Sequence, residues 1–199
     1  MTRMMKCDKI VDLRTYASIN NTRKFFLDTN VLYWYTYPRF SLPNQLTRTA
    51  RTYYDFIDKL ITAGNPLETS VYNLTELLNV IEKNEYDIYC DLHTGIPVTR
   101  KDFRKMLSER TDVSKIMKTS LNNASGICKV VDFDFTQTAV NRFVDEFIEH
   151  RCDVFDYTIL RHCIQSKSLN IISDDSDFST MEKITLYTAN ENVLGNISL

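Results

Sequence analysis

Residues 24–32 read Lys-Phe-Phe-Leu-Asp-Thr-Asn-Val-Leu, and this stretch decides the fold that the sequence predicts. Its run Phe25-Phe26-Leu27 is apolar without alternation, which is typical of a strand buried on both faces of a parallel sheet. The run ends abruptly at Asp28. Further short strands are predicted at 67–70, 130–131, 170–173 and 184–187. Because these strands alternate with helices, the sequence predicts an α/β domain with a central, mainly parallel sheet.

Four helices are predicted from apolar residues repeated at the spacing of one helix face. The first covers 44–63 and ends at Gly64-Asn65-Pro66, and the second covers 72–84. The third follows the capping-box spacing of Asp134-Phe135-Thr136-Gln137, and the fourth runs from about 154 to 167.

Two stretches lie outside this alternation. Residues 1–22 are mixed and polar, and we interpret them as an N-terminal arm or an accessory strand. Residues 85–126 pass through a loop around Gly95 and Pro97 and then carry an excess of basic side chains. We interpret this second stretch as a helical insertion in one domain at 23–199.

The basic insertion has two interpretations. It is either a solvated helical face or an electrostatic track for RNA phosphates, with Tyr86 and Tyr89 as stacking surfaces. The basic side chains that would form the track are Arg100, Lys101, Arg104 and Lys105.

The composition is that of a folded protein. Its 199 residues are 43% hydrophobic and carry a net charge of -2, which by itself says nothing about partners. Five cysteines without a C-x-x-C pair predict reduced thiols in a cytoplasmic protein. No apolar run is long enough to span a bilayer, so we expect no membrane partner. Only four glycines occur, and no G-x-G-x-x-G or P-loop is present.

Acidic residues follow two of the predicted strands. Asp28 ends the first strand, and Asp174, Asp175 and Asp177 follow the strand at 170–173. Ligands of open α/β sheets bind at the carboxyl ends of strands, so neighbouring strands would bring these acids together. Clustered carboxylates repel one another unless a cation neutralises them, and Mg²⁺ or Mn²⁺ prefers such oxygen ligands. The pattern therefore predicts a divalent metal site that could cleave a phosphodiester.

Each acid also has a purely structural interpretation. Asp28 could cap a helix that begins near Val31, and Glu76 lies three residues after Asn73, at capping-box spacing. Asp153 and Asp156 stand at a helix start, where acids favour the helix dipole. These structural roles are least adequate for the cluster at 174–177, because a turn needs only one acid.

Read together, four motifs resemble those of the PIN-domain nucleases, including the VapC-type toxins. They are Phe26-Leu27-Asp28-Thr29-Asn30-Val31-Leu32, Asn73-Leu74-Thr75-Glu76-Leu77-Leu78, Asp156-Tyr157-Thr158-Ile159-Leu160 and Ile171-Ile172-Ser173-Asp174-Asp175-Ser176-Asp177-Phe178. No single motif is specific, but the four occur in the right order and in the expected elements. The resemblance covers about 24–84 and 127–190, whereas 1–22 and 85–126 have no counterpart.

The resemblance implies a three-layer α/β/α fold and cleavage of RNA with Mg²⁺ or Mn²⁺. Asp28, Glu76, Asp156 and Asp175 match the family's four acids. The metal ligands would be Asp28, Asp156 and Asp175, with Asp177 as an auxiliary acid. The side chains expected to support them are Thr29, Asn30, Asp153, Ser173 and Asp174. An antitoxin protein is an implied partner, and a homodimer is left open.

Two other functions compete with a ribonuclease. One is a PIN-like module that binds RNA or a protein without cutting, and the presence of all four acids argues against it. The other is an acid-site phosphatase or a flap-type DNA nuclease that uses similar metals. Metal dependence and a comparison of tRNA, mRNA and branched DNA as substrates would separate these functions.

Overall fold

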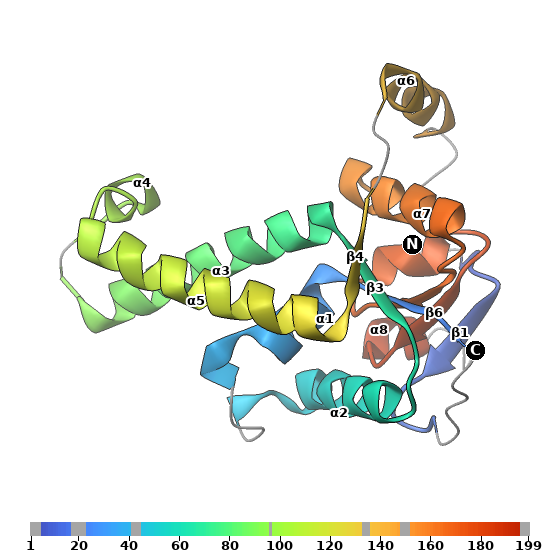
Figure 1. Cartoon of the computed structure of the whole chain (residues 1–199), viewed down its shortest axis with the longest axis horizontal. Helices are drawn as coiled ribbons and strands as arrows, with labels where there is room; N and C mark the ends of the chain where they lie inside the picture. Colours follow the sequence, from blue (N-terminus) through green and yellow to red (C-terminus); the bar gives the residue numbers. More distant parts are fainter. Residues whose placement is uncertain are drawn as a thin grey trace.

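The computed structural model describes residues 5–16, 23–40, 45–95, 97–132, 136–147 and 152–195. A sheet of six strands forms the centre (Figure 1). In chain order the strands are β1 (Lys9–Asp12), β2 (Phe25–Leu27), β3 (Leu67–Ser70), β4 (Lys129–Val131), β5 (Asn170–Ile172) and β6 (Thr185–Thr188). Their order across the sheet is β1-β6-β5-β2-β3-β4, and every neighbouring pair is parallel. The predicted α/β domain with a parallel sheet is thus confirmed.

The helices between and after the strands cover both faces of the sheet. They are α1 (Thr29–Thr36), α2 (Arg48–Thr62), α3 (Val71–Leu92), α4 (Arg100–Phe103), α5 (Leu107–Ile127), α6 (Gln137–Glu146), α7 (Val154–Ser166) and α8 (Glu191–Leu194). Two short 3-10 helices, η1 (Pro38–Phe40) and η4 (Ser176–Thr180), follow α1 and β5. Of the described helices, none is long and apolar enough to cross a membrane.

Alternate residues of the central strands face two separate cores. Phe25 and Leu27 of β2 pack with α1, α2, α3 and α5, whereas Phe26 between them packs with α7 and α8. In β5, Ile172 belongs to the first core and Ile171 to the second. Because both faces are covered, strands without polar alternation are stable here. This arrangement is the three-layer α/β/α fold that the resemblance implied.

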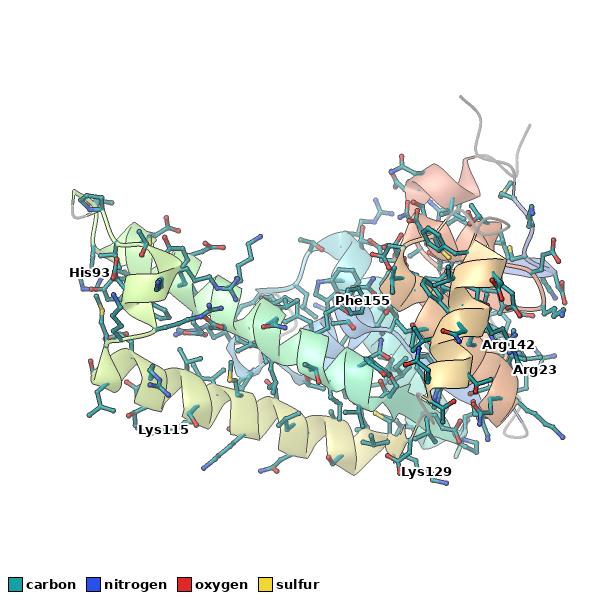
Figure 2. The ribbon with its side chains drawn as sticks, turned by 90° about the horizontal axis from the view of Figure 1, so that it is seen from above. Arg23, His93, Lys115, Lys129, Arg142 and Phe155 are labelled. Carbon is teal, nitrogen blue, oxygen red and sulfur yellow. The ribbon has the colours of Figure 1, made fainter. Side chains whose placement is uncertain are left out.

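The stretch at 85–126 is helical for most of its length, but its boundary differs from the prediction. The predicted helix at 72–84 continues to Leu92, so the first residues of this stretch belong to α3. Figure 1 shows α3 and α5 side by side as a hairpin that projects from the sheet, with α4 at its far end. In Figure 2, His93 marks the far end and Lys129 the end next to the sheet.

Tyr86 and Tyr89 are part of this hairpin's own packing. Both rings contact Phe103 of α4, at centroid distances of 5.6 Å and 5.3 Å. The Tyr86 hydroxyl donates to the carbonyl of Val98, and the Tyr89 ring stacks on His93. These rings therefore hold the end of the hairpin together, which explains why α3 continues past the predicted end.

The other predicted helices form close to their expected bounds. The helix at 44–63 begins at Arg48, with Thr47 as its N-cap, and Gly64 takes a positive φ of 74° just after its end. The fourth helix, α7, runs from Val154 to Ser166. The third is α6, and the capping box expected at 134–137 lies partly outside the described residues.

Of the two interpretations left open for residues 1–22, the accessory strand forms within the described part. It is β1, which pairs in parallel with β6 at the edge of the sheet. The backbone N–H of Leu13 continues this pairing by donating to the carbonyl of Thr188 over 3.0 Å. The division of the chain into an arm and a domain stays a prediction.

Candidate functional site

Asp28 lies at the carboxyl end of β2, with 6% of its surface exposed. Its Oδ1 accepts a hydrogen bond of 2.7 Å from the backbone N–H of Thr29, so it caps α1. Its Oδ2 accepts from the hydroxyl of Ser173 (2.6 Å) and the amide of Asn30 (3.0 Å). The structural interpretation of Asp28 as a cap is thus confirmed, and it does not exclude a role in the site.

Burial dominates the electrostatics of Asp28. The loss of water raises the pKa of its carboxyl from 3.8 to about 7, although hydrogen bonds from Ser173 and Thr29 oppose this change. The nearby negative charges of Glu76 and Asp175 raise the pKa further. The carboxylate is therefore held in a fixed orientation in a place that disfavours its own charge.

Glu76 reaches the site from α3. Its Oε2 accepts a hydrogen bond of 2.5 Å from the hydroxyl of Thr29. The capping role considered for Glu76 is wrong, because the N-cap of α3 is Ser70, which accepts from the backbone N–H of Asn73. Glu76 is exposed and stands in the second turn of the helix, so its carboxylate faces the site without closing a helix end.

Asp156 comes from the first turn of α7 and is half-buried. Burial and then the negative charges of Asp153, Asp175, Asp28 and Asp177 raise the pKa of its carboxyl to about 8. Asp153 is the N-cap of α7, accepting from the backbone N–H groups of Phe155 and Asp156. The two acids thus differ in role: Asp153 caps the helix, whereas Asp156 lines a cavity together with the other acids of the site.

The acids after β5 divide between two neighbourhoods. Asp175 caps η4 by accepting from the N–H of Asp177 over 2.8 Å, and its own N–H donates to Ser173 Oγ. Asp174 instead accepts from the hydroxyl of Tyr53 over 2.9 Å. Burial raises the pKa of Asp174, while the bond from Tyr53 opposes this.

One cavity brings the four predicted catalytic acids together. It has a volume of about 260 Å³. The residues that line it are Asp28, Thr29, Asn30, Tyr33, Trp34, Glu76, Val80, Asp156 and Asp175. The lining thus contains two of the five predicted supporting residues, Thr29 and Asn30, whereas Asp177 is not part of it. Of the described residues in the wall, none is basic.

The acids share this cavity without forming a finished metal site. Within the described residues, no group of three carboxylate, imidazole or thiol side chains stands ready to hold a metal ion. The donor chemistry is nevertheless that of a hard cation, because the wall offers carboxylate, amide and hydroxyl oxygens. Among the described residues of the wall, the acids also have no basic neighbour that could neutralise their charge.

The basic residues of the insertion are mostly engaged in ion pairs. Arg100 and Arg104 both bind Glu82 of α3, with Nε to Oε1 distances of 3.2 Å and 2.5 Å. Lys105 pairs with Asp102 over 2.7 Å. The fourth cation of the predicted track is Lys101, which is exposed on α4. The two pairs with Glu82 fasten α4 to α3, and all three pairs lower the positive charge that an RNA phosphate would meet there.

Sequence reasoning missed several residues that shape the site, of which three matter most. Asn73 donates from Nδ2 to both Asp28 Oδ1 (3.2 Å) and Thr29 Oγ1 (3.1 Å). The Tyr53 hydroxyl lies against Ser173, and Trp34 lines the cavity. Only Asn73 had a usable signal, since it stands one helical turn before Glu76 on the same face.

Comparison with known proteins adds little. No protein-family model matches the sequence, and no curated protein matches it significantly. The structure is similar to a chain in the crystal structure of VapBC2 from Rickettsia felis bound to a DNA fragment from their promoter. The two chains share 16% sequence identity and a TM-score of 0.48, over 82% of this chain and 96% of that one. A likeness this distant carries no argument about function.

Proposed function

We propose that the chain is a Mg²⁺- or Mn²⁺-dependent endoribonuclease whose active site is the acidic cavity. The observation that carries this proposal is the meeting of Asp28, Glu76, Asp156 and Asp175 in one cavity wall. These acids come from the end of β2, from α3, from α7 and from the turn after β5. Chance or helix capping alone would not direct four carboxylates from such distant positions into one cavity.

The residues fit a divalent cation in their chemistry. Burial and mutual repulsion raise the pKa of Asp28 to about 7 and that of Asp156 to about 8, so the site disfavours its own charges. A cation would relieve this repulsion, and we assign its ligands as Asp28, Asp156 and Asp175, with Asp177 beside them. When bound, it would supply positive charge to phosphate oxygens and lower the pKa of an attacking water.

The chain's own residues would orient the reaction. Ser173, Asn30 and Asn73 fix the carboxylate of Asp28 from both sides, which holds it ready without reorganisation. Thr29 holds the Glu76 carboxylate at the cavity. We assign Glu76 to accept a hydrogen bond from the attacking water and so aim it at the phosphorus.

The choice of RNA, the expected 5′-phosphate and 3′-hydroxyl products and a toxin role all rest on the motif resemblance. The same holds for an antitoxin as partner. A toxin of this kind would arrest growth when it is expressed alone, and the Asp28→Asn variant would not.

The test is cleavage of an end-labelled single-stranded RNA and a DNA of the same sequence, with Mn²⁺ or with EDTA. We expect RNA cleavage by the wild type in Mn²⁺ only, and none by Asp28→Asn, which should remain folded by circular dichroism. Asp87→Asn, an exposed acid of α3, is the matched control and should cut normally.

Three outcomes would contradict the proposal. Full activity of Asp28→Asn would remove the cavity as the active site. Cleavage of DNA but not RNA would make the chain a DNA nuclease. If Mn²⁺ neither supports cleavage nor raises the melting temperature, the chain would be a binding module.

A further inference from the structure

We infer that Trp34 is a stacking surface for one unpaired nucleobase of the substrate, an inference that rests on the proposed nuclease function. The residues that line the cavity are of two chemical kinds. Its acids, Thr29 and Asn30 are polar, whereas Tyr33, Trp34 and Val80 are aromatic or apolar. A ligand that fills it must carry groups suited to both, and a nucleotide does so with its phosphate and its flat base.

Helix geometry directs Trp34 to the acids. Asn30 of α1 reaches the strand ends, where its amide donates to Asp28 and its Oδ1 accepts from the N–H of Asp174. Residues four apart lie on the same face of a helix, so the side of α1 that carries Asn30 also carries Trp34. Both side chains line the cavity, as does Tyr33.

Trp34 is also held in place from behind. Its ring lies 5.2 Å from that of Tyr53, tilted by 34°. Tyr53 is fully buried, and its hydroxyl is bonded to Ser173, Asp174 and Thr188 and to the N–H of Ala189. The Trp34 ring therefore rests on a rigid support, while part of it remains exposed and lines the cavity. A pre-positioned ring loses little entropy when a base stacks on it.

The lack of basic side chains among the described residues of the wall makes this ring important for affinity. None of them could form an ion pair with a phosphate. Apart from the cation and the few hydrogen-bond donors of the wall, the aromatic residues are the part of the lining that can bind a base. Stacking on an aromatic ring is sequence-tolerant, because every base has a π-face.

If Trp34 stacks on a base, the nucleic acid that binds must be single-stranded at that position. A base within a duplex is stacked on its neighbours, so it is not accessible to a side chain unless it is extruded. The volume of about 260 Å³ is just below the range of roughly 300–1,000 Å³ typical of pockets for drug-sized ligands. We therefore expect it to take one nucleotide rather than several.

The test uses the fact that the chain has a single tryptophan. Intrinsic fluorescence at 295 nm excitation then reports on Trp34 alone. We would titrate the wild type in Mg²⁺ with adenosine 5′-monophosphate, which has no phosphodiester to cut, and with ribose 5-phosphate, which lacks the base. Stacking predicts quenching by the nucleotide only, and binding that is about tenfold tighter than that of the sugar phosphate.

Two variants separate stacking from mere apolar filling. Trp34→Phe keeps an aromatic ring and should cut a single-stranded RNA with a KM within about twofold of the wild type. Trp34→Leu keeps an apolar side chain and should raise the KM about tenfold at unchanged kcat, since stacking binds substrate and transition state alike. A duplex of the same sequence should be cut much more slowly by all three proteins.

The outcomes keep this inference apart from the proposed function. If RNA is cut in Mg²⁺ but Trp34→Leu has the wild-type KM, the stacking role is wrong and the nuclease stands. Equal binding of the two small ligands, or fluorescence that the nucleotide leaves unchanged, would also overturn the stacking role. The same holds if the cavity binds a protein segment and no nucleotide. If the wild type cuts no RNA with either metal, the proposed nuclease function itself is contradicted.

Discussion

The substitution Asp156→Asn gives the sharpest test of the electrostatics of the site. The carboxyl of Asp156 is half-buried, and among the described residues no hydrogen bond holds it. Its amide counterpart has nearly the same shape and carries no charge. The variant therefore removes one repulsive charge from the cavity and leaves the packing of α7 intact.

The direction of the pKa change determines whether the stability rises or falls with pH. Folding raises the pKa of Asp156 from 3.8 to about 8. Between these values the native protein keeps a proton that the unfolded chain has lost, so the stability falls as the pH rises through this interval. The stabilising contribution is present below about pH 4 and is gone above about pH 8. An asparagine does not titrate, so the variant should lack this decline.

The magnitude can be worked from the same values. A rise from 3.8 to about 8 corresponds to at most about 6 kcal/mol at about 1.4 kcal/mol for each pH unit. Solvent reaches the half-buried group, so we expect about 2–3 kcal/mol. For a chain of 199 residues this corresponds to a melting temperature about 4–12 °C higher in the variant at pH 8.5.

The assay is thermal unfolding of the wild type and the variant in EDTA from pH 5 to pH 9. We expect the melting temperatures of the two proteins to diverge progressively as the pH rises, with the variant more stable at pH 8.5. Asp87→Asn, which removes one exposed charge from α3, should follow the wild type. If the melting temperatures of the wild type and Asp156→Asn change in parallel over the whole pH range, folding does not disfavour the ionised form of this carboxyl.

Three further outcomes follow from the structure. Mg²⁺ should raise the melting temperature of the wild type more at pH 8 than at pH 5, because the ionised acids bind it. An equal rise at both pH values, or an equal rise in Asp28→Asn, would contradict a metal site in the acidic cavity. Asn73→Ala removes two hydrogen bonds that orient Asp28 and Thr29, so kcat should fall about tenfold while circular dichroism is unchanged; unaltered kcat would show that this support is dispensable. Gly64→Ala places a side chain at a φ of 74° and should cost about 1 kcal/mol in urea unfolding; wild-type stability would contradict the strain.

Much of the candidate site could be predicted from the sequence because strand ends are local features. An apolar run that stops at Asp28, and another that stops before Asp174, mark where two buried strands leave the sheet. In a parallel sheet these ends lie at one edge, and β2 and β5 are indeed neighbours. The helix periods likewise predicted the bounds of α2 and α7 to within a few residues.

Only the tertiary structure decided which way each polar side chain turns. Asp174 and Asp175 are adjacent, yet the first binds Tyr53 and the second lines the cavity. The reason is that the partners lie far away in the chain, as with Tyr53 and Asp174, which are 121 positions apart. The pairing of Arg100 and Arg104 with Glu82 is of the same kind.

The sequence by itself thus determined the alternation of strands and helices, the strand ends and the acids that stand there. These features depend on local hydrophobic patterns, because a strand that is buried on both faces of a sheet appears in the sequence as a continuous apolar run. The cavity, the raised pKa values of Asp28 and Asp156 and the place of Trp34 depended on the tertiary structure. These properties arise from loss of water and from charges brought close by folding, and neither is written in the spacing of residues along the chain.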